Sequence, residues 1–134
     1  MRYRVLAMLL VAVVAAFSSG CNRRDSESRL TTSSTRWSWT AELNYETEDD
    51  TWLWTTVLTQ ADVEIRLRDY VGIIRVRVWD GADVKIFDVE YDNSFDRDDD
   101  RHIASTLAGA AGEWRIRVDL YDFDGKLRVT FDQP

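Results

Sequence analysis

Strict alternation of apolar and polar residues is the dominant pattern of this chain. The alternating apolar positions lie in the segments 37–45, 52–58, 63–67, 74–78, 114–120 and 127–131. Successive side chains of a β-strand point to opposite faces, so a period of two predicts strands with one buried and one solvated face. No stretch of residues 36–134 shows convincing helical spacing, so the pattern predicts an all-β domain.

Turn residues separate several of these segments. Asp-Gly pairs at 80–81 and 124–125 lie between alternating segments, and this pair is typical of tight β-hairpins. The acidic residues 48–50 lie between the first two segments and predict a third hairpin, in which Tyr45 falls near Trp52.

The hairpin at 80–82 has a predicted register. A three-residue loop there places Val78 opposite Val84 and Val76 opposite Ile86, with all four side chains on one face. After Ile86 the apolar phase changes, so we expect either a bulge at 86–87 or a strand that is buried on both faces.

These observations predict the fold class. About seven or eight short strands with one polar face each form a two-sheet antiparallel β-sandwich, of jelly-roll or immunoglobulin-like type. A closed barrel is the main alternative. The outward positions carry Arg, Asp and Glu in mixed order, as expected for solvated sheet faces.

The first residues have the composition of a secretory signal peptide. Arg2 and Arg4 precede the apolar residues 5–17, and the small residues 18–20 follow before Cys21, the one cysteine of the chain. The apolar run is shorter than the about 17–25 residues that span a bilayer. We therefore expect a helical signal segment over residues 1–20 that is cleaved rather than a membrane anchor.

The position of Cys21 resembles the acylation site of bacterial lipoproteins, although Ser18 departs from the Leu, Val or Ile usual there. The resemblance implies that Cys21 carries the lipid, that the lipid bilayer is a partner, and that the protein lies in the bacterial cell envelope. Asn22 favours the outer membrane over the inner one, at its periplasmic or surface face. The alternative is a plain signal peptide and a free thiol. Residues 21–35 are then a flexible polar tether, and residues 36–134 form one domain.

Charge and composition exclude several classes of function. The chain has 17 basic and 24 acidic residues, a net charge of −7, which argues against a nucleic-acid partner. His102 is the single histidine, and no serine lies in a Gly-x-Ser-x-Gly setting. We therefore expect a protein that is not an enzyme.

Tryptophans are the first candidates for a binding site. The pairs Trp37 and Trp39, and Trp52 and Trp54, could form a platform for glycan rings, but their phase matches the apolar positions and favours the core. Trp79 differs, because it lies in phase with the arginines on the polar face of its strand. It is the predicted ligand-binding residue.

An acidic segment is the candidate metal site. Calcium takes six to eight oxygen ligands, and alternating polar residues can supply them. The residues with this spacing are Asp92, Ser94, Asp96 and Asp98. The alternative is a solvated loop in which neighbouring arginines balance the acids, and no other cofactor is expected.

One stretch resembles a known family. The segments 109–118 and 125–129, together with 73–81, are similar to the closing strands of prepeptidase C-terminal-like and proprotein-convertase accessory β-sandwiches. The resemblance implies a non-catalytic sandwich of the kind often appended to secreted enzymes. It also implies that Asp96 and Asp98 are the nearest matches to the calcium-binding carboxylates of some members.

Together the patterns predict a membrane-anchored envelope lipoprotein of non-catalytic binding or interaction type. The alternatives are a carbohydrate-binding module that uses Trp79, and a calcium-stabilised structural or assembly-accessory lipoprotein. An envelope protein or a glycan is the expected partner.

Overall fold

The computed structural model describes residues 27–134, so the signal segment and Cys21 lie outside the described residues. The described part contains five strands and no helix, and thus no helix that could cross a membrane. The strands are β1 (Glu27–Thr32), β2 (Arg36–Thr56), β3 (Asp62–Trp79), β4 (Lys85–Ser105) and β5 (Gly112–Asp132). They pair antiparallel in one sheet, in the order β1-β2-β5-β3-β4.

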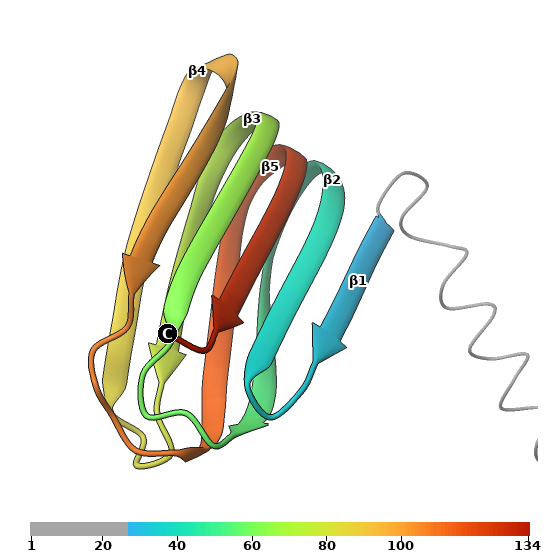
Figure 1. The fold of residues 1–134 in the computed structure, drawn as a ribbon. Helices are drawn as coiled ribbons and strands as arrows, with labels where there is room; N and C mark the ends of the chain where they lie inside the picture. Colours follow the sequence, from blue (N-terminus) through green and yellow to red (C-terminus); the bar gives the residue numbers. More distant parts are fainter. Residues whose placement is uncertain (1–26) are drawn as a thin grey trace, which may run out of the picture.

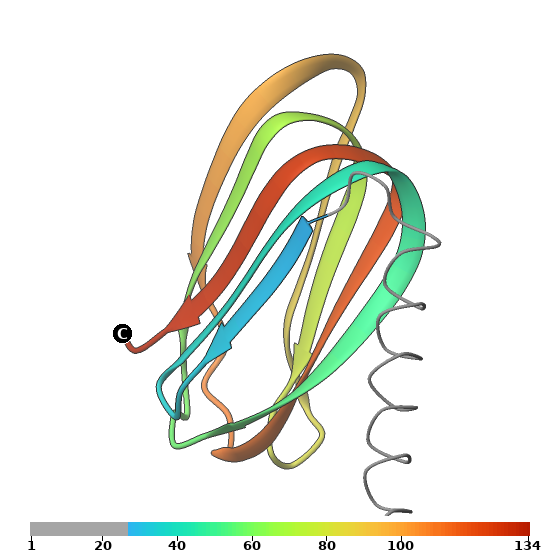
Figure 2. The same cartoon turned by 90° about the vertical axis from the view of Figure 1, so that its right-hand side faces the viewer.

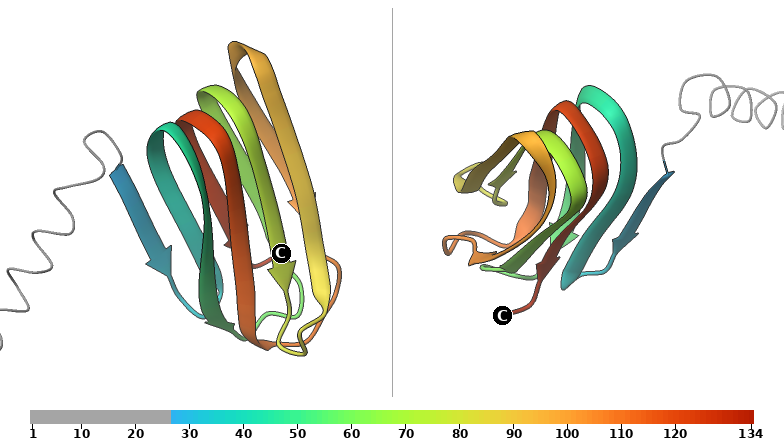
Figure 3. Two further views of the ribbon diagram at one scale, coloured as in Figure 1. Left: turned by 180° about the vertical axis from the view of Figure 1, so that it is seen from behind. Right: turned by 90° about the horizontal axis from the view of Figure 1, so that it is seen from above.

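This single sheet folds over on itself. The four long strands, β2 to β5, bend at the same end of the molecule, and their two halves face each other (Figures 1 and 2). Layer A consists of β1 and residues 36–43, 62–68, 98–105 and 125–132. Layer B consists of residues 46–56, 72–79, 85–93 and 112–121. Seen from above, the folded sheet wraps around the interior (Figure 3).

The bend, which we call the crest, depends on irregular backbone. The strand registers shift between Leu43 and Glu46 and between Leu67 and Tyr70, as β-bulges do. Gly72 has φ of 104°, and a Cβ there would lie 2.4 Å from the carbonyl oxygen of Asp122. Only glycine therefore allows β3 and β5 to approach this closely at the crest.

The core fills the space between the two layers. Trp37 and Trp39 of layer A contact Trp52 of layer B, with ring centroids 5.4 and 4.7 Å apart. Phe87 and Phe131 meet edge to face across the same interior. The predicted core role is confirmed for most of the alternating apolar positions, including Trp37, Trp39, Ile65, Val76, Ile116 and Val129, but Tyr45 is 57% exposed.

The number of strands and sheets is a correction to the predicted fold. The structure has five strands, four of them long, in one folded sheet, not seven or eight strands in two sheets. Two predicted hairpin turns, at 48–50 and 124–125, lie within β2 and β5. Tyr45 consequently does not pair with Trp52, and Trp52 pairs with Ile116 of β5. A bend and a hairpin need similar turn residues, so the sequence pattern did not separate them.

The hairpin at Asp80 is confirmed, with a shifted register. Asp80 accepts hydrogen bonds from the backbone amides of Ala82 and Val84, which close the turn between β3 and β4. Val78 pairs with Phe87 rather than Val84, and the register shifts at this point. The predicted bulge at 86–87 is present, and it buries both Ile86 and Phe87.

The predicted tether also needs correction. Glu27–Thr32 forms β1, which pairs with residues 37–42 of β2. Every residue of β1 is exposed, so no apolar pattern marks it as a strand. Its backbone bonds to β2, and the Ser28 hydroxyl that accepts from Trp39 Nε1 at 2.8 Å, hold it at the sheet edge.

Candidate functional site

Trp79 lies on the outer face of layer B between two arginines. The guanidinium carbon of Arg115 is 4.5 Å from the centre of the Trp79 ring, and that of Arg77 is 5.7 Å away. The indole is half-buried. Cation–π contacts of this kind stabilise an exposed sheet face. Arginine side chains therefore surround Trp79, the residue that the sequence predicts to bind a ligand.

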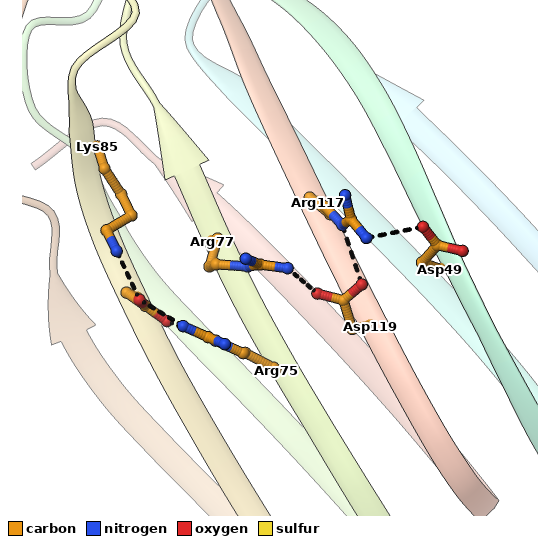
Figure 4. Close-up of polar contacts among 7 residues, drawn as sticks. Asp49, Arg75, Arg77, Lys85, Arg117 and Asp119 are labelled. Carbon is orange, nitrogen blue, oxygen red and sulfur yellow. Dashed lines mark hydrogen bonds and ion pairs between the residues drawn. The ribbon is translucent and has the colours of Figure 1, made fainter.

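The same outer face carries a ladder of ion pairs, which we call the paired face (Figure 4). Asp88 accepts from Arg75 and from Lys85, each at 2.9 Å. Asp119 accepts from Arg77 and, at 2.9 Å, from Arg117. Arg117 also reaches Asp49 of β2 at 2.8 Å, and Arg115 lies 3.0 Å from Asp83.

Two carboxylates of this ladder have lowered pKa values. Hydrogen bonds from Arg75 and then Lys85 hold the pKa of Asp88 well below its usual range. Burial favours the neutral form of Asp119, but hydrogen bonds from Arg77 and Arg117 together lower its pKa. Both acids are therefore ionised at neutral pH, and each serves two cations of the paired face.

The predicted calcium ligands lie along the crest end of β4. Asp92 pairs with Ile73, and Asp98 pairs with Tyr70, three residues before Ile73 on β3. The Ser94 hydroxyl bonds to the Asp92 carboxylate. Within residues 27–134 no group of three or more acidic, histidine or cysteine side chains could hold a metal ion. Calcium binding at Asp92, Ser94, Asp96 and Asp98 stays a prediction.

Neighbouring acids of this segment are bound to the protein itself. Asp99 accepts from the Asp69 amide at 2.7 Å, and Asp100 accepts from the Tyr70 hydroxyl at 2.7 Å. Arg97 donates to the Asp69 carbonyl at 2.8 Å. These bonds fasten β4 to the bend of β3, so the acidic segment has a structural role at the crest.

A groove at the crest gathers exposed aromatic side chains, and we call it the crest groove. Tyr45 of β2, Phe95 of β4 and Tyr121 of β5 are 57, 93 and 64% exposed. All three line one groove of about 340 Å³. The remaining lining residues are Val71, Gly72, Ile73, Ser94 and Asp122. The groove combines aromatic rings with three hydroxyls, those of Tyr45, Tyr121 and Ser94, and the carboxylate of Asp122.

The bends of the four long strands position these residues. Tyr45 and Asp122 both have φ of 48°, a left-handed conformation that is unusual for a residue as bulky as tyrosine. Arg97 bonds to Asp124, and a hydrogen bond with Tyr45 also contributes to its raised pKa. The Asp122 amide donates to Thr47 at 2.8 Å. The groove is thus braced from three strands, and such strain often marks a functional position.

Sequence reasoning missed the crest groove. The sequence does indicate that Tyr121 is exposed, because it lies out of phase with the buried Trp114, Ile116 and Leu120 of the same strand. Tyr45 continues the apolar phase of β2 and was expected in the core. Only the shared bend brings the three aromatic residues together, since they come from different strands.

Comparison with known proteins finds resemblance only among solved structures. No family model and no curated protein matches the chain. A carbohydrate-binding module of Cellvibrio mixtus lichenase 5A, in complex with cellotriose, is 8% identical over 85% of this chain and 92% of its own, with a TM-score of 0.45. TmCBM61 in complex with β-1,4-galactotriose is 12% identical over 80% of this chain and 66% of its own, with a TM-score of 0.44. A family 4 carbohydrate-binding module is 11% identical over 78% of this chain and 74% of its own, with a TM-score of 0.43.

Proposed function

We propose that this chain is a non-catalytic glycan-binding protein and that the crest groove is its sugar site. The observation that carries the proposal is the convergence of Tyr45, Phe95 and Tyr121, all exposed, on one groove. Large aromatic rings exposed together are typical of binding surfaces. The apolar face of a sugar ring stacks on such rings, and the tyrosine hydroxyls bond to the sugar hydroxyls.

The size and polarity of the groove also support a small ligand. Its volume of about 340 Å³ lies within the range of ligand sites, and its lining combines aromatic rings with hydroxyl groups and a carboxylate. Ser94 and Asp122 could orient the sugar by hydrogen bonds to its hydroxyls. Glycoside hydrolysis needs two carboxyl groups, and the lining of this groove has one, at Asp122. Binding without catalysis is therefore the function that fits the groove.

Binding should depend on the crest and not on Trp79. A glycan array identifies a ligand, and calorimetry then compares Phe95→Ala and Tyr121→Ala with the unmodified protein. We expect each variant to bind about tenfold more weakly, the loss of one stacking contact. Leu53→Ala is the matched control, because Leu53 is 65% exposed but lies outside the groove.

Two outcomes would overturn the proposal. If Trp79→Ala abolishes binding while both crest variants bind normally, the sugar site is the one at Trp79. If no glycan binds at all, the assembly-accessory alternative takes its place. Normal binding by Trp79→Ala and Leu53→Ala, with weak binding by the crest variants, supports the crest groove.

The proposal includes lipid attachment at Cys21 in the bacterial cell envelope, at the outer membrane rather than the inner one. Because β1 begins at Glu27, an acylated Cys21 would lie at most about 20–22 Å of extended chain from the folded domain. Two or three acyl chains are enough for stable anchoring. Cys21→Ser should abolish metabolic labelling with palmitate and release soluble protein, and unchanged membrane fractionation would contradict the anchor.

A further inference from the structure

The outer face of layer A carries a row of arginines, which we call the arginine row. Arg66 of β3 pairs directly with Arg128 of β5 on one side and with Arg101 of β4 on the other. Thr40 of β2 continues the row from Arg128 to Arg29 of β1. Four arginines from four strands therefore lie in line across the sheet, although the chain as a whole is acidic.

Within residues 27–134, one acid, Glu64, forms ion pairs with the four arginines of the row. Glu64 is shared by Arg101 at 2.9 Å and Arg66 at 3.7 Å. Arg29 and Arg128 are exposed and form no ion pair with any residue between 27 and 134. Like charges directly opposite each other destabilise a sheet. The arrangement thus costs folding free energy, and an external anion would recover it.

Grooves follow the arginine row. One of about 600 Å³ is lined by three basic side chains, Arg29, Lys126 and Arg128, and also by the acids Glu27 and Glu42. A second, of about 360 Å³, is lined by Arg66, Arg68 and Arg101 and also by the acids Asp99 and Asp100. Since Arg128 and Arg66 are direct partners, the two grooves lie side by side and form a shallow track across the strands.

Acidic residues border this track. Glu27 and Glu42 pair with each other on one side of the row, and Asp62 and Asp132 pair on the other. A flat anionic membrane would meet these acids as well as the arginines and would be repelled by them. A single extended chain can lie along the row itself, where basic side chains outnumber acidic ones by three to two in each groove. The charge pattern therefore favours a linear polyanion over a bilayer.

We propose that the arginine row is a second binding site that takes a linear polysaccharide bearing carboxylates. Guanidinium groups form two-pronged bonds with carboxylates, and the row presents one such group on each of four strands, with Thr40 of β2 between Arg29 and Arg128. No exposed aromatic residue lies among the residues lining these two grooves, so bases of a single-stranded nucleic acid would find no stacking partner. The site is separate from the crest groove and does not depend on it.

The test uses polygalacturonate and its methyl ester, which has the same backbone without the charge. The protein carries Cys21→Ser, so that an acyl chain cannot contribute to any arm. We expect calorimetric binding of polygalacturonate at about 0.01 M salt, weakening strongly at about 0.15 M as the Debye length falls. The methyl ester should not bind.

Matched charge variants locate the site. Arg128→Gln should weaken polygalacturonate binding about tenfold. Arg75→Gln removes the same charge from the paired face and should change binding by less than about twofold. Tyr121→Ala should bind polygalacturonate normally, which separates this site from the crest groove. Thermal unfolding confirms that each variant is folded.

Several results would overturn the inference. Equal losses in Arg128→Gln and Arg75→Gln would show a response to overall charge alone. Absence of polygalacturonate binding at low salt would remove the site. Tighter, Arg128-dependent binding to phosphatidylglycerol vesicles or to single-stranded oligothymidine would assign the row to a membrane or to nucleic acid instead.

Discussion

Both outer faces of the folded sheet carry rows of arginines, but within residues 27–134 only the paired face supplies each arginine of its row with a carboxylate. On the paired face, Arg75 and Lys85 share Asp88, and Arg77 and Arg117 share Asp119. On the outer face of layer A, Glu64 forms ion pairs with the two arginines nearest β4, and Arg128 also helps to lower its pKa through charge attraction. Arginine therefore has different surroundings on the two faces, paired with carboxylates on one and largely facing other arginines on the other.

This difference indicates which outer face of the sheet is available to bind a partner. Charges that are satisfied within the protein fix the positions of neighbouring strands and leave little for a ligand. Charges left in water cost repulsion and are available for a partner. Layer B therefore has a structural outer face, and layer A has a face suited to recognition. The crest groove lies where the two layers meet.

The largest expected effect comes from breaking the bend that separates the two faces. In Gly72→Ala, the new Cβ would lie 2.4 Å from the Asp122 carbonyl oxygen, at a backbone φ of 104°. We expect a loss of about 2–4 kcal/mol in unfolding free energy, measured by urea denaturation.

Gly112→Ala is the control for this change. Gly112 has a similar φ of 124°, but the nearest atom to its Cβ position would be 3.6 Å away. Its loss should reflect backbone strain alone, about 1 kcal/mol. Equal losses at both positions would show that the close approach at the crest contributes nothing.

The second effect concerns the centre of the paired face. Asp119→Ala leaves Arg77 and Arg117, direct partners in the β3–β5 register, without their shared anion. The side chain of Asp119 is 27% exposed, so we expect a loss of about 1–3 kcal/mol in chemical denaturation.

Asp49 provides the comparison, because it bonds to Arg117 alone and its side chain is 61% exposed. Asp49→Ala should cost less than about 0.5 kcal/mol. If the two variants were equally stable, the ladder would not be the structural element that its geometry indicates.

The sequence predicted the interior of this fold better than its topology. Period-two alternation identified Trp37, Ile65 and Val76 as buried, because burial on one face of a strand repeats at every second residue. The bends were not predictable in the same way. Asp124-Gly125 has the chemistry of a hairpin turn, yet it lies inside β5, where φ of 136° at Gly125 bends a continuous strand.

The surface sites were harder to predict for a physical reason. Tyr45, Phe95 and Tyr121 meet only after three strands bend at the same height. The arginine row likewise depends on strand order, since Arg66 and Arg128 come from strands distant in sequence. Local patterns report which face a residue lies on, but register decides its neighbours.

The third prediction concerns how the stability that Asp88 and Glu64 provide depends on pH, since each of these acids is shared by two cations. Hydrogen bonding holds the pKa of Asp88 below its usual value of 3.8 in the folded state. The stabilisation is therefore complete above the unfolded pKa and is lost as pH falls toward the folded one. Asp88→Asn should cost about 1 kcal/mol at pH 7, and the difference should shrink below about pH 4.

Glu64 sharpens this comparison on the other face. Its pKa is lowered mainly by the hydrogen bond from Arg101, but its second cation, Arg66, is 3.7 Å away. Glu64→Gln should show the same sign of pH dependence with a smaller amplitude. Thermal unfolding between about pH 2 and 7 measures both, and a pH-independent difference for Asp88→Asn would contradict the ion-pair interpretation.

The smallest effect should have the opposite sign on the two faces. Arg128→Gln removes a charge directly opposite Arg66 and breaks no ion pair within the described residues, so stability should stay the same or rise by up to about 0.5 kcal/mol. Arg77→Gln keeps a similar side chain but leaves Asp119 without one of its two donors, and stability should fall. Urea denaturation of the two variants side by side measures this sign. A loss above about 1 kcal/mol in Arg128→Gln would mean that Arg128 has a structural role. The two outer faces would then not differ in the way proposed, because Arg128 would stabilise the fold as the arginines of the paired face do.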